Sequence, residues 1–159
     1  MNIEILCVGK LKETYLKEAV NEYAKRLSRY CKLSITEVID EKTADKQSEA
    51  QDMIVLKKEG ERLKNLIREN AHVIALEISG KTMDSVSFAQ YLNELSIRSV
   101  SDVQFVIGGS LGLYPDVLNR ADLKLSFSEM TFPHQLMRVI LLEQIYRGFR
   151  IINHEPYHK

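Results

Sequence analysis

The stretch "DVQFVIGGSLGLYPDV", residues 102–117, decides the fold because an apolar run typical of a buried strand leads directly into three glycines. The run "DVQFVI" has the length and composition of a strand, and "LYPDVLNRA" after the glycines predicts a short helix. Gly108, Gly109 and Gly112 allow positive φ and a close approach of the backbone to a ligand. The loop contains neither the lysine of a phosphate loop nor the cysteine of a thiol enzyme.

Strand patterns alternate with helix patterns along the rest of the chain. This alternation predicts an α/β fold with an open, mostly parallel sheet flanked by helices. We find no repeat, low-complexity tract or linker, so we expect one domain over residues 1–159. "SGKT", residues 79–82, predicts a turn, and Pro133 predicts the start of the last helix. Strands are expected at 2–8, 32–40, 72–78, 102–109 and 123–128, and helices at 12–30, 47–69, 84–95, 113–121 and 133–152.

The composition argues against several classes of protein. The chain carries 22 basic and 22 acidic side chains, so it has no broad attraction to nucleic acid. Basic side chains are nevertheless gathered in residues 10–32, with seven bases against three acids. No stretch approaches the roughly 20 apolar residues of a membrane helix, and we expect a cytosolic protein. Cys7 and Cys31 have no metal-ligand spacing, so they are interpreted as buried, reduced thiols and no metal is expected.

Two stretches of the sequence are similar to phosphate-binding motifs but lack a glycine that each motif requires. "GGSLGL" has Ser110 where a dinucleotide fingerprint needs its second glycine. "ALEISGKT" ends like a Walker loop but has Ala75 at its first glycine position. The second stretch is better explained as a strand-to-helix turn with an N-cap at Asp84 or Ser85. A nucleotide-binding regulatory module is therefore disfavoured.

Three predicted strands end in polar or glycine-rich sequence: "ALEISG", "VIGGSLG" and "LSFSEMTFPH". In an open parallel sheet, ligands bind beyond the carboxyl ends of the strands. The glycines and hydroxyl residues of these ends supply backbone groups and hydroxyls without adding charge, so the pocket that they form is expected to be nearly neutral, Glu129 apart. Such a pocket suits an adenosine that carries a sulfonium group. Because the sulfonium is itself positively charged, the ligand needs no basic side chain as a partner. The alternative is that the glycines form tight turns without a ligand. The hydroxyls belong to Ser110, Ser126, Ser128 and Thr131.

The motifs "FVIGGSLGL", "LSFSEMTFPHQLMRVILLEQIYR" and "HEPYHK" closely resemble the small SPOUT-superfamily methyltransferases of large-subunit ribosomal RNA. The specific resemblance is to the pseudouridine N3-methyltransferases of 23S rRNA, the ribosomal large subunit methyltransferase H family, and it runs from Met1 to Lys159. It implies a C-terminal deep trefoil knot, a homodimer and S-adenosylmethionine as cofactor. It also implies the assembled ribosome as partner, with neither DNA nor membrane.

The resemblance assigns the cofactor contacts to the same three strand ends. Phe127 and Phe132 fit a packing role in the core nearly as well as a cofactor contact. The residues implied for cofactor binding are Leu76, Gly108, Phe127, Ser128, Glu129, Met130, Thr131 and Phe132.

The reaction requires that N3 of a uracil-type base lose its proton, so some group must accept that proton or stabilise the developing anion. Nitrogen methylation needs no cysteine nucleophile. In the tail "HEPYHK" we nominate His158 as base or shuttle and Tyr157 as a stacking or hydrogen-bonding partner, with His154 less favoured. A disordered tail is the alternative. Arg138 and His134 are candidates for contact with RNA.

The last helix has eleven apolar residues in 19, too many for a single stripe, so it is expected to be buried on more than one side. It forms either a central core element or half of a subunit interface.

Glu143 and Arg147 are predicted to form a weak surface pair. The basic helix of residues 12–32 is a hypothetical RNA contact. Competing functions are 2′-O-ribose or guanine methylation by another SPOUT enzyme, and a ribosome-binding factor without catalysis.

Overall fold

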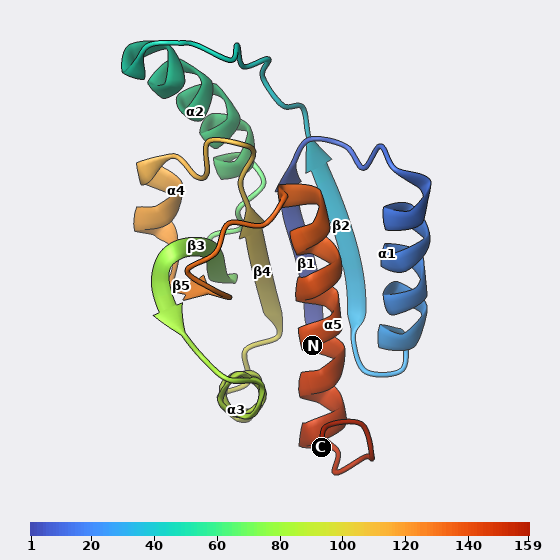
Figure 1. Ribbon diagram of the computed structural model, residues 1–159. Coiled ribbons are helices and arrows are strands. Elements are labelled where there is room, and N and C mark those ends of the chain that lie inside the picture. Colours follow the sequence, from blue (N-terminus) through green and yellow to red (C-terminus); the bar gives the residue numbers. More distant parts are fainter.

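The computed structural model describes residues 1–159, which form a five-stranded sheet between two layers of helices (Figure 1). All strand pairs are parallel, and the strand order is β2-β1-β4-β3-β5. The predicted α/β architecture is thus confirmed. The strands are β1 (Asn2–Val8), β2 (Lys32–Val38), β3 (His72–Thr82), β4 (Asp102–Ile107) and β5 (Leu123–Ser126), and the helices are α1 (Thr14–Leu27), α2 (Glu49–Lys64), α3 (Ser85–Ile97), α4 (Pro115–Arg120) and α5 (His134–Ile152).

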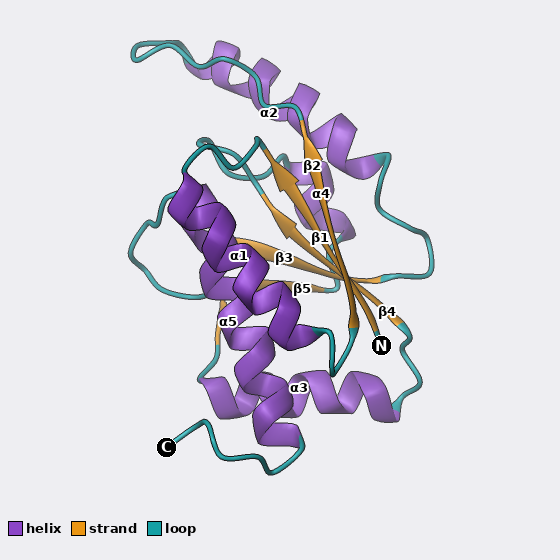
Figure 2. Cartoon of the chain, turned by 90° about the vertical axis from the view of Figure 1, so that its right-hand side faces the viewer, coloured by secondary structure: helices purple, strands orange, loops and turns teal.

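Helices α1, α3 and α5 cover one face of the sheet, and α2 and α4 cover the other (Figure 2). Each face has its own core, with 17 buried residues on the first side and nine on the second. Strand β1 contributes to both cores because successive side chains point to opposite faces. Ile5 and Cys7 belong to the larger core, and Leu6 and Val8 to the smaller one.

The predicted turn at residues 79–82 is wrong, because these residues belong to β3. The register of β3 against β5 shifts between Leu76 and Lys81, so the strand bulges and then pairs with β5 again. A Cβ at Gly80 would lie 2.7 Å from the backbone oxygen of Lys124. Glycine therefore lets the bulge pass close to the neighbouring strand, a tertiary contact that local turn preferences do not reveal.

Helix α5 runs along the centre of its face, between α1 and α3 (Figure 1). None of its 19 residues is exposed, which confirms the prediction of a helix buried on more than one side. Helix α2 ends at Lys64, earlier than expected, and begins with a capping box in which Ser48 and Gln51 satisfy each other's backbone N–H groups. The N-cap of α3 is Asp84, one of the two predicted caps.

Both cysteines are free thiols. Cys7 is buried beneath α5, whereas Cys31 is half-buried after α1. Burial raises the pKa of both thiols to about 11. At neutral pH both are therefore protonated and poorly nucleophilic. Each helix is too short or too polar to span a lipid bilayer.

Candidate functional site

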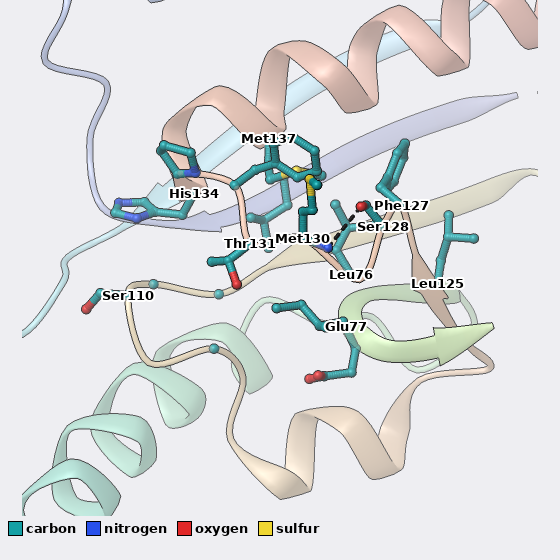
Figure 3. Close-up of a pocket in the computed structure, with 17 residues that line it drawn as sticks. Leu76, Glu77, Ser110, Leu125, Phe127, Ser128, Met130, Thr131, His134 and Met137 are labelled. Carbon is teal, nitrogen blue, oxygen red and sulfur yellow. Dashed lines mark hydrogen bonds between the residues drawn. The ribbon is translucent and has the colours of Figure 1, made fainter. Parts of the chain in front are cut away.

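A pocket of about 500 Å³ opens over the bulge of β3 and the carboxyl ends of β4 and β5 (Figure 3). These three strands are neighbours in the sheet, so the bulge of β3 and the chain segments that follow β4 and β5 meet at one edge. We call residues 108–112 the glycine loop and residues 127–133 the β5–α5 segment. The pocket is lined by Leu76, Glu77, Ile78, Ile107, Gly108, Gly109, Ser110, Gly112, Leu125, Phe127, Ser128, Met130, Thr131, Phe132, Pro133, His134 and Met137.

The glycine loop closes tightly on itself. The backbone N–H of Gly112 donates to the carbonyl oxygen of Gly109 at 3.1 Å, and Gly112 has a φ of +87°. A Cβ at Gly108 would lie 2.3 Å from the carbonyl oxygen of Gly112. Any side chain at Gly108 would therefore force the loop open and change the wall of the pocket.

The β5–α5 segment supplies the most exposed part of the pocket. Its polar side-chain contacts are local: Ser126 Oγ donates to the Ser128 carbonyl at 3.2 Å, and the Met130 N–H donates to Ser128 Oγ at 2.9 Å. Met130 is 74% exposed. Leu76, Met130, Thr131 and Met137 line this part of the cavity (Figure 3). The wall is therefore apolar, with hydroxyl and backbone groups at its rim.

Glu77 and His134 are the only titratable side chains that line the pocket. Burial lowers the pKa of His134, and the positive charge of Arg138 lowers it further, while Asp40 opposes the shift. His134 is therefore neutral at pH 7. The lining consequently holds one carboxylate and no full positive charge, an arrangement that does not repel a cationic ligand.

Most of the residues that the sequence suggested for cofactor binding line this pocket. Glu129 is the exception, since its side chain is exposed and does not line the cavity. Sequence reasoning missed Glu77 and Ile78 because they lie in the bulge of β3, and Met137 because it lies one turn inside α5. Met137 could have been found from its spacing of four residues after Pro133. The predicted residues that line the pocket are Leu76, Gly108, Phe127, Ser128, Met130, Thr131 and Phe132.

Arg138 is completely buried, so the structure contradicts its predicted contact with RNA. Its guanidinium donates to the carbonyl oxygens of Val8 at 3.0 Å and Gly9 at 2.6 Å, and it pairs with Glu37 Oε1 at 2.6 Å. These partners lie at the ends of β1 and β2. Arg138 therefore ties the first turn of α5 to the sheet beside the pocket.

The C-terminal tail packs against α5. Tyr157 donates its hydroxyl proton to Glu143 Oε1 at 3.1 Å and lies edge-on to Tyr146, with ring centroids 5.0 Å apart. The guanidinium carbon of Arg147 lies 4.6 Å from the centroid of the Tyr157 ring. Glu143 and Arg147 are thus not the simple surface pair that was predicted, because together they hold the tail. Burial and the contact with Glu143 raise the pKa of Tyr157 to about 12.

His158 does not line the pocket just described but lines a second one, of about 360 Å³, together with Asp84, Ser85 and Gln144. The two pockets share Leu125 and Phe127. His158 is exposed, and its Nδ1 lies 3.3 Å from a guanidinium nitrogen of Arg147. His154 is also exposed and has a φ of 55°. Within one chain, therefore, His158 lies in a neighbouring pocket, and neither His158 nor Tyr157 lines the pocket at the ends of β4 and β5.

A parallel α/β sheet with a weakly charged pocket beside adjacent strand ends is the arrangement of α/β proteins that bind small ligands at one edge of their sheet. The chain belongs to the SPOUT methyltransferase family, whose model, described as predicted SPOUT methyltransferase, matches residues 1–158. It is thus a methyltransferase.

Relatives that match the whole chain carry the name ribosomal RNA large subunit methyltransferase H. The proteins of Clostridium novyi and Clostridium tetani are each 58% identical over 159 residues, with full coverage of both chains. The protein of Clostridium beijerinckii is 55% identical over the same length. A solved structure of a probable methylase family protein from Haemophilus influenzae has a TM-score of 0.55 at 11% identity, covering 99% of this chain and 70% of that one. This last similarity supports the fold.

Proposed function

We propose that the chain transfers a methyl group from S-adenosylmethionine to N3 of pseudouridine 1915 in 23S rRNA of the assembled ribosome. The pocket over the bulge of β3 and the ends of β4 and β5 carries the proposal, because it combines the size of a nucleoside site with the absence of a competing cation. The full-length relatives named for ribosomal RNA methylation supply the substrate class.

The residues of the pocket fit the proposed cofactor. Apolar side chains such as Leu76, Leu125 and Met137 suit the faces of an adenine ring, and the backbone of the glycine loop suits its polar edge. Glu77 supplies a carboxylate suited to ribose hydroxyls or an ammonium group. When bound, the cofactor supplies an electrophilic methyl group on a sulfonium.

The chain's own task is then to orient the acceptor base and take its N3 proton. Tyr157 keeps its proton at neutral pH because its pKa is about 12, so we assign it stacking and hydrogen bonding rather than proton abstraction. His158 is the proposed proton acceptor. Its place in the neighbouring pocket, across Leu125 and Phe127 from the cofactor site, supports this assignment.

The remaining proposals concern the organisation of the chain and its partners. We infer a single domain over residues 1–159 with a C-terminal knot, and a homodimer that acts on cytoplasmic ribosomes. Lys25, Arg26 and Arg29 are exposed on and just after α1, which suits them to contact ribosomal RNA, although Arg26 also pairs with Glu22 at 2.8 Å. Reversing these three charges to Glu is expected to weaken ribosome binding and leave cofactor affinity intact.

The decisive experiment incubates the protein with labelled S-adenosylmethionine and ribosomes that lack the modification, with and without pseudouridine at the target. Methyl transfer only to pseudouridylated ribosomes, located on the base by nucleoside mass spectrometry, would support the proposal. A label on ribose or guanine would instead indicate a different SPOUT reaction. No cofactor binding by calorimetry would indicate a ribosome-binding factor without catalysis.

A further inference from the structure

Helix α2 contacts the glycine loop from outside the pocket through a buried carboxylate. Glu59 is 5% exposed, and its Oε1 accepts a hydrogen bond from the backbone N–H of Glu41 at 3.0 Å. The same carboxylate lies against Gly109, where a Cβ would be 3.0 Å from Oε2 and 3.4 Å from Oε1. Glu59 therefore connects the chain after β2 to the loop after β4, past the end of β1 that lies between these strands.

The next residue of the helix supports the other end of the loop. A Cβ at Gly60 would lie 2.5 Å from the Cβ of Tyr114, so the tyrosine packs directly against the backbone of α2. Tyr114 is the N-cap of α4 and follows the glycine loop by two residues. Figure 1 shows α2 beside α4 at this edge of the sheet. Two consecutive residues of α2 thus hold the loop on both sides.

A buried carboxylate with one hydrogen bond is a poor way to stabilise a fold. Burial raises the pKa of Glu59, and the neighbouring Asp40 and Glu41 raise it further, while the N–H of Glu41 and the charge of Arg62 act in the opposite direction. A neutral side chain of the same size would avoid this cost. The carboxylate is therefore better explained by what it holds in place than by stability.

We propose that Glu59 is a positioning residue for the methyltransferase reaction: its carboxylate fixes Gly109 and so sets the wall that the glycine loop presents to the cofactor. Gly109 is the link, since a side chain there would meet Glu59 Oε2 at 3.0 Å and since Gly109 also lines the pocket. The inference rests on the proposed function only in taking this pocket as the cofactor site.

The test compares Glu59→Gln with Glu61→Gln, which removes the same charge from an exposed position on the same helix. Without any cofactor, amide hydrogen exchange at residues 109–112 is expected to become about fivefold faster in Glu59→Gln and to stay unchanged in the control. The midpoint of thermal unfolding should remain equal to or above that of the wild type, because the buried charge is gone.

Cofactor binding supplies the second measurement. Calorimetry with S-adenosylmethionine is expected to show a Kd about tenfold higher for Glu59→Gln. On ribosomes, the KM for the cofactor should rise with kcat almost unchanged. Glu59→Asp keeps the charge but is one methylene shorter, and it should recover part of the affinity.

The outcomes separate this inference from the proposed function. Unchanged loop exchange in a folded Glu59→Gln protein overturns the inference, whether or not the protein binds the cofactor. A tenfold loss of affinity accompanied by a matching fall in thermal stability also overturns it, because Glu59 would then be structural. If the wild type binds no S-adenosylmethionine, the proposed function fails, while faster loop exchange in the variant still supports the positioning of Gly109.

Discussion

The glycine loop and the β5–α5 segment line the same pocket but are held in different ways. The glycine loop is closed by its own backbone bond and supported from α2 by Glu59 and Gly60. The β5–α5 segment bonds mainly to itself through Ser128, and its tip at Met130 is exposed. Its firm support lies at its far end, where Arg138 ties α5 to β1.

This difference divides the site into a preformed wall and an adaptable one. A preformed wall reduces the entropy lost on binding, whereas an exposed segment can close over a ligand after it has entered. We therefore expect substitutions in the supports of the pocket to have large effects and substitutions at the exposed tip to have small ones.

The largest effect is expected from Arg138→Ala. The substitution removes the guanidinium from two backbone carbonyls and from Glu37, which keeps only the N–H of Leu11, and should lower the free energy of unfolding by about 3–5 kcal/mol. Urea denaturation measures this loss, and Arg138→Lys should recover part of it. If Arg138→Ala kept the stability of the wild type and lost only ribosome binding, Arg138 would contact RNA after all, and the structural role assigned here would be wrong.

Gly108→Ala tests the preformed wall directly. The new methyl group would meet the carbonyl of Gly112, so the loop must open, and overpacking of this kind costs about 1–3 kcal/mol. We expect affinity for S-adenosylmethionine to fall up to about 100-fold in calorimetry. Leu111→Ala, at the one position of the same loop that does not line the pocket, is the matched control. Equal affinities for the two variants would show that the loop is not rigid.

Gly60→Ala is expected to lower the stability of the protein, whereas helix propensity alone predicts that it would raise it. Alanine in a helix interior normally stabilises by about 1 kcal/mol relative to glycine. Here the methyl group would overlap Tyr114, so thermal unfolding should instead occur at a lower temperature. A rise in the midpoint would mean that Tyr114 moves away freely and that α2 gives the loop little support.

His134 gives the pocket a dependence on pH. Its pKa is lowered by burial, so its protonated form is disfavoured in the folded protein. The contribution of His134 to stability is therefore present above its ordinary pKa of 6.5 and declines as the pH falls below it. Cofactor affinity should decrease a few-fold between pH 7 and 5.5, because protonated His134 would place a positive charge beside the positively charged sulfonium of the cofactor. His134→Gln should flatten this profile, and an unchanged profile would exclude His134 as its cause.

Ser128→Ala should have the smallest effect. It removes the acceptor for the N–H of Met130 in a partly exposed segment, where water can replace the lost bond. Cofactor affinity is expected to change less than about twofold. A loss as large as that of Gly108→Ala would mean that the β5–α5 segment is as firmly set as the glycine loop.

Much of the fold follows from local patterns in the sequence. The apolar run at residues 2–8 coincides with β1, because strands buried on both faces read as continuous apolar stretches. The strand expected at 102–109 is β4, which ends two residues earlier, at Ile107. The location of the pocket follows from a general rule about parallel sheets. The bulge in β3 was missed because it depends on the fit of Gly80 against β5, which no local pattern encodes.

The roles of individual polar residues were harder to predict. Arg138 looks like a surface residue in a one-dimensional pattern, and only the fold brings the carbonyls of β1 to its side chain. Glu59 lies in a charged helix and resembles its exposed neighbour Glu61. A buried charge is identified by the partners that enclose it, and those partners are distant in sequence.

The protonated state of Cys7 and Cys31 opens a way to watch the adaptable wall. Thiol-specific dyes react with thiolates, and a pKa of about 11 leaves very little thiolate on either native cysteine at neutral pH. A cysteine placed at the exposed tip by Met130→Cys would thus be labelled selectively in an otherwise unmodified chain. Its fluorescence would report on the closing of the segment over an arriving ligand in real time.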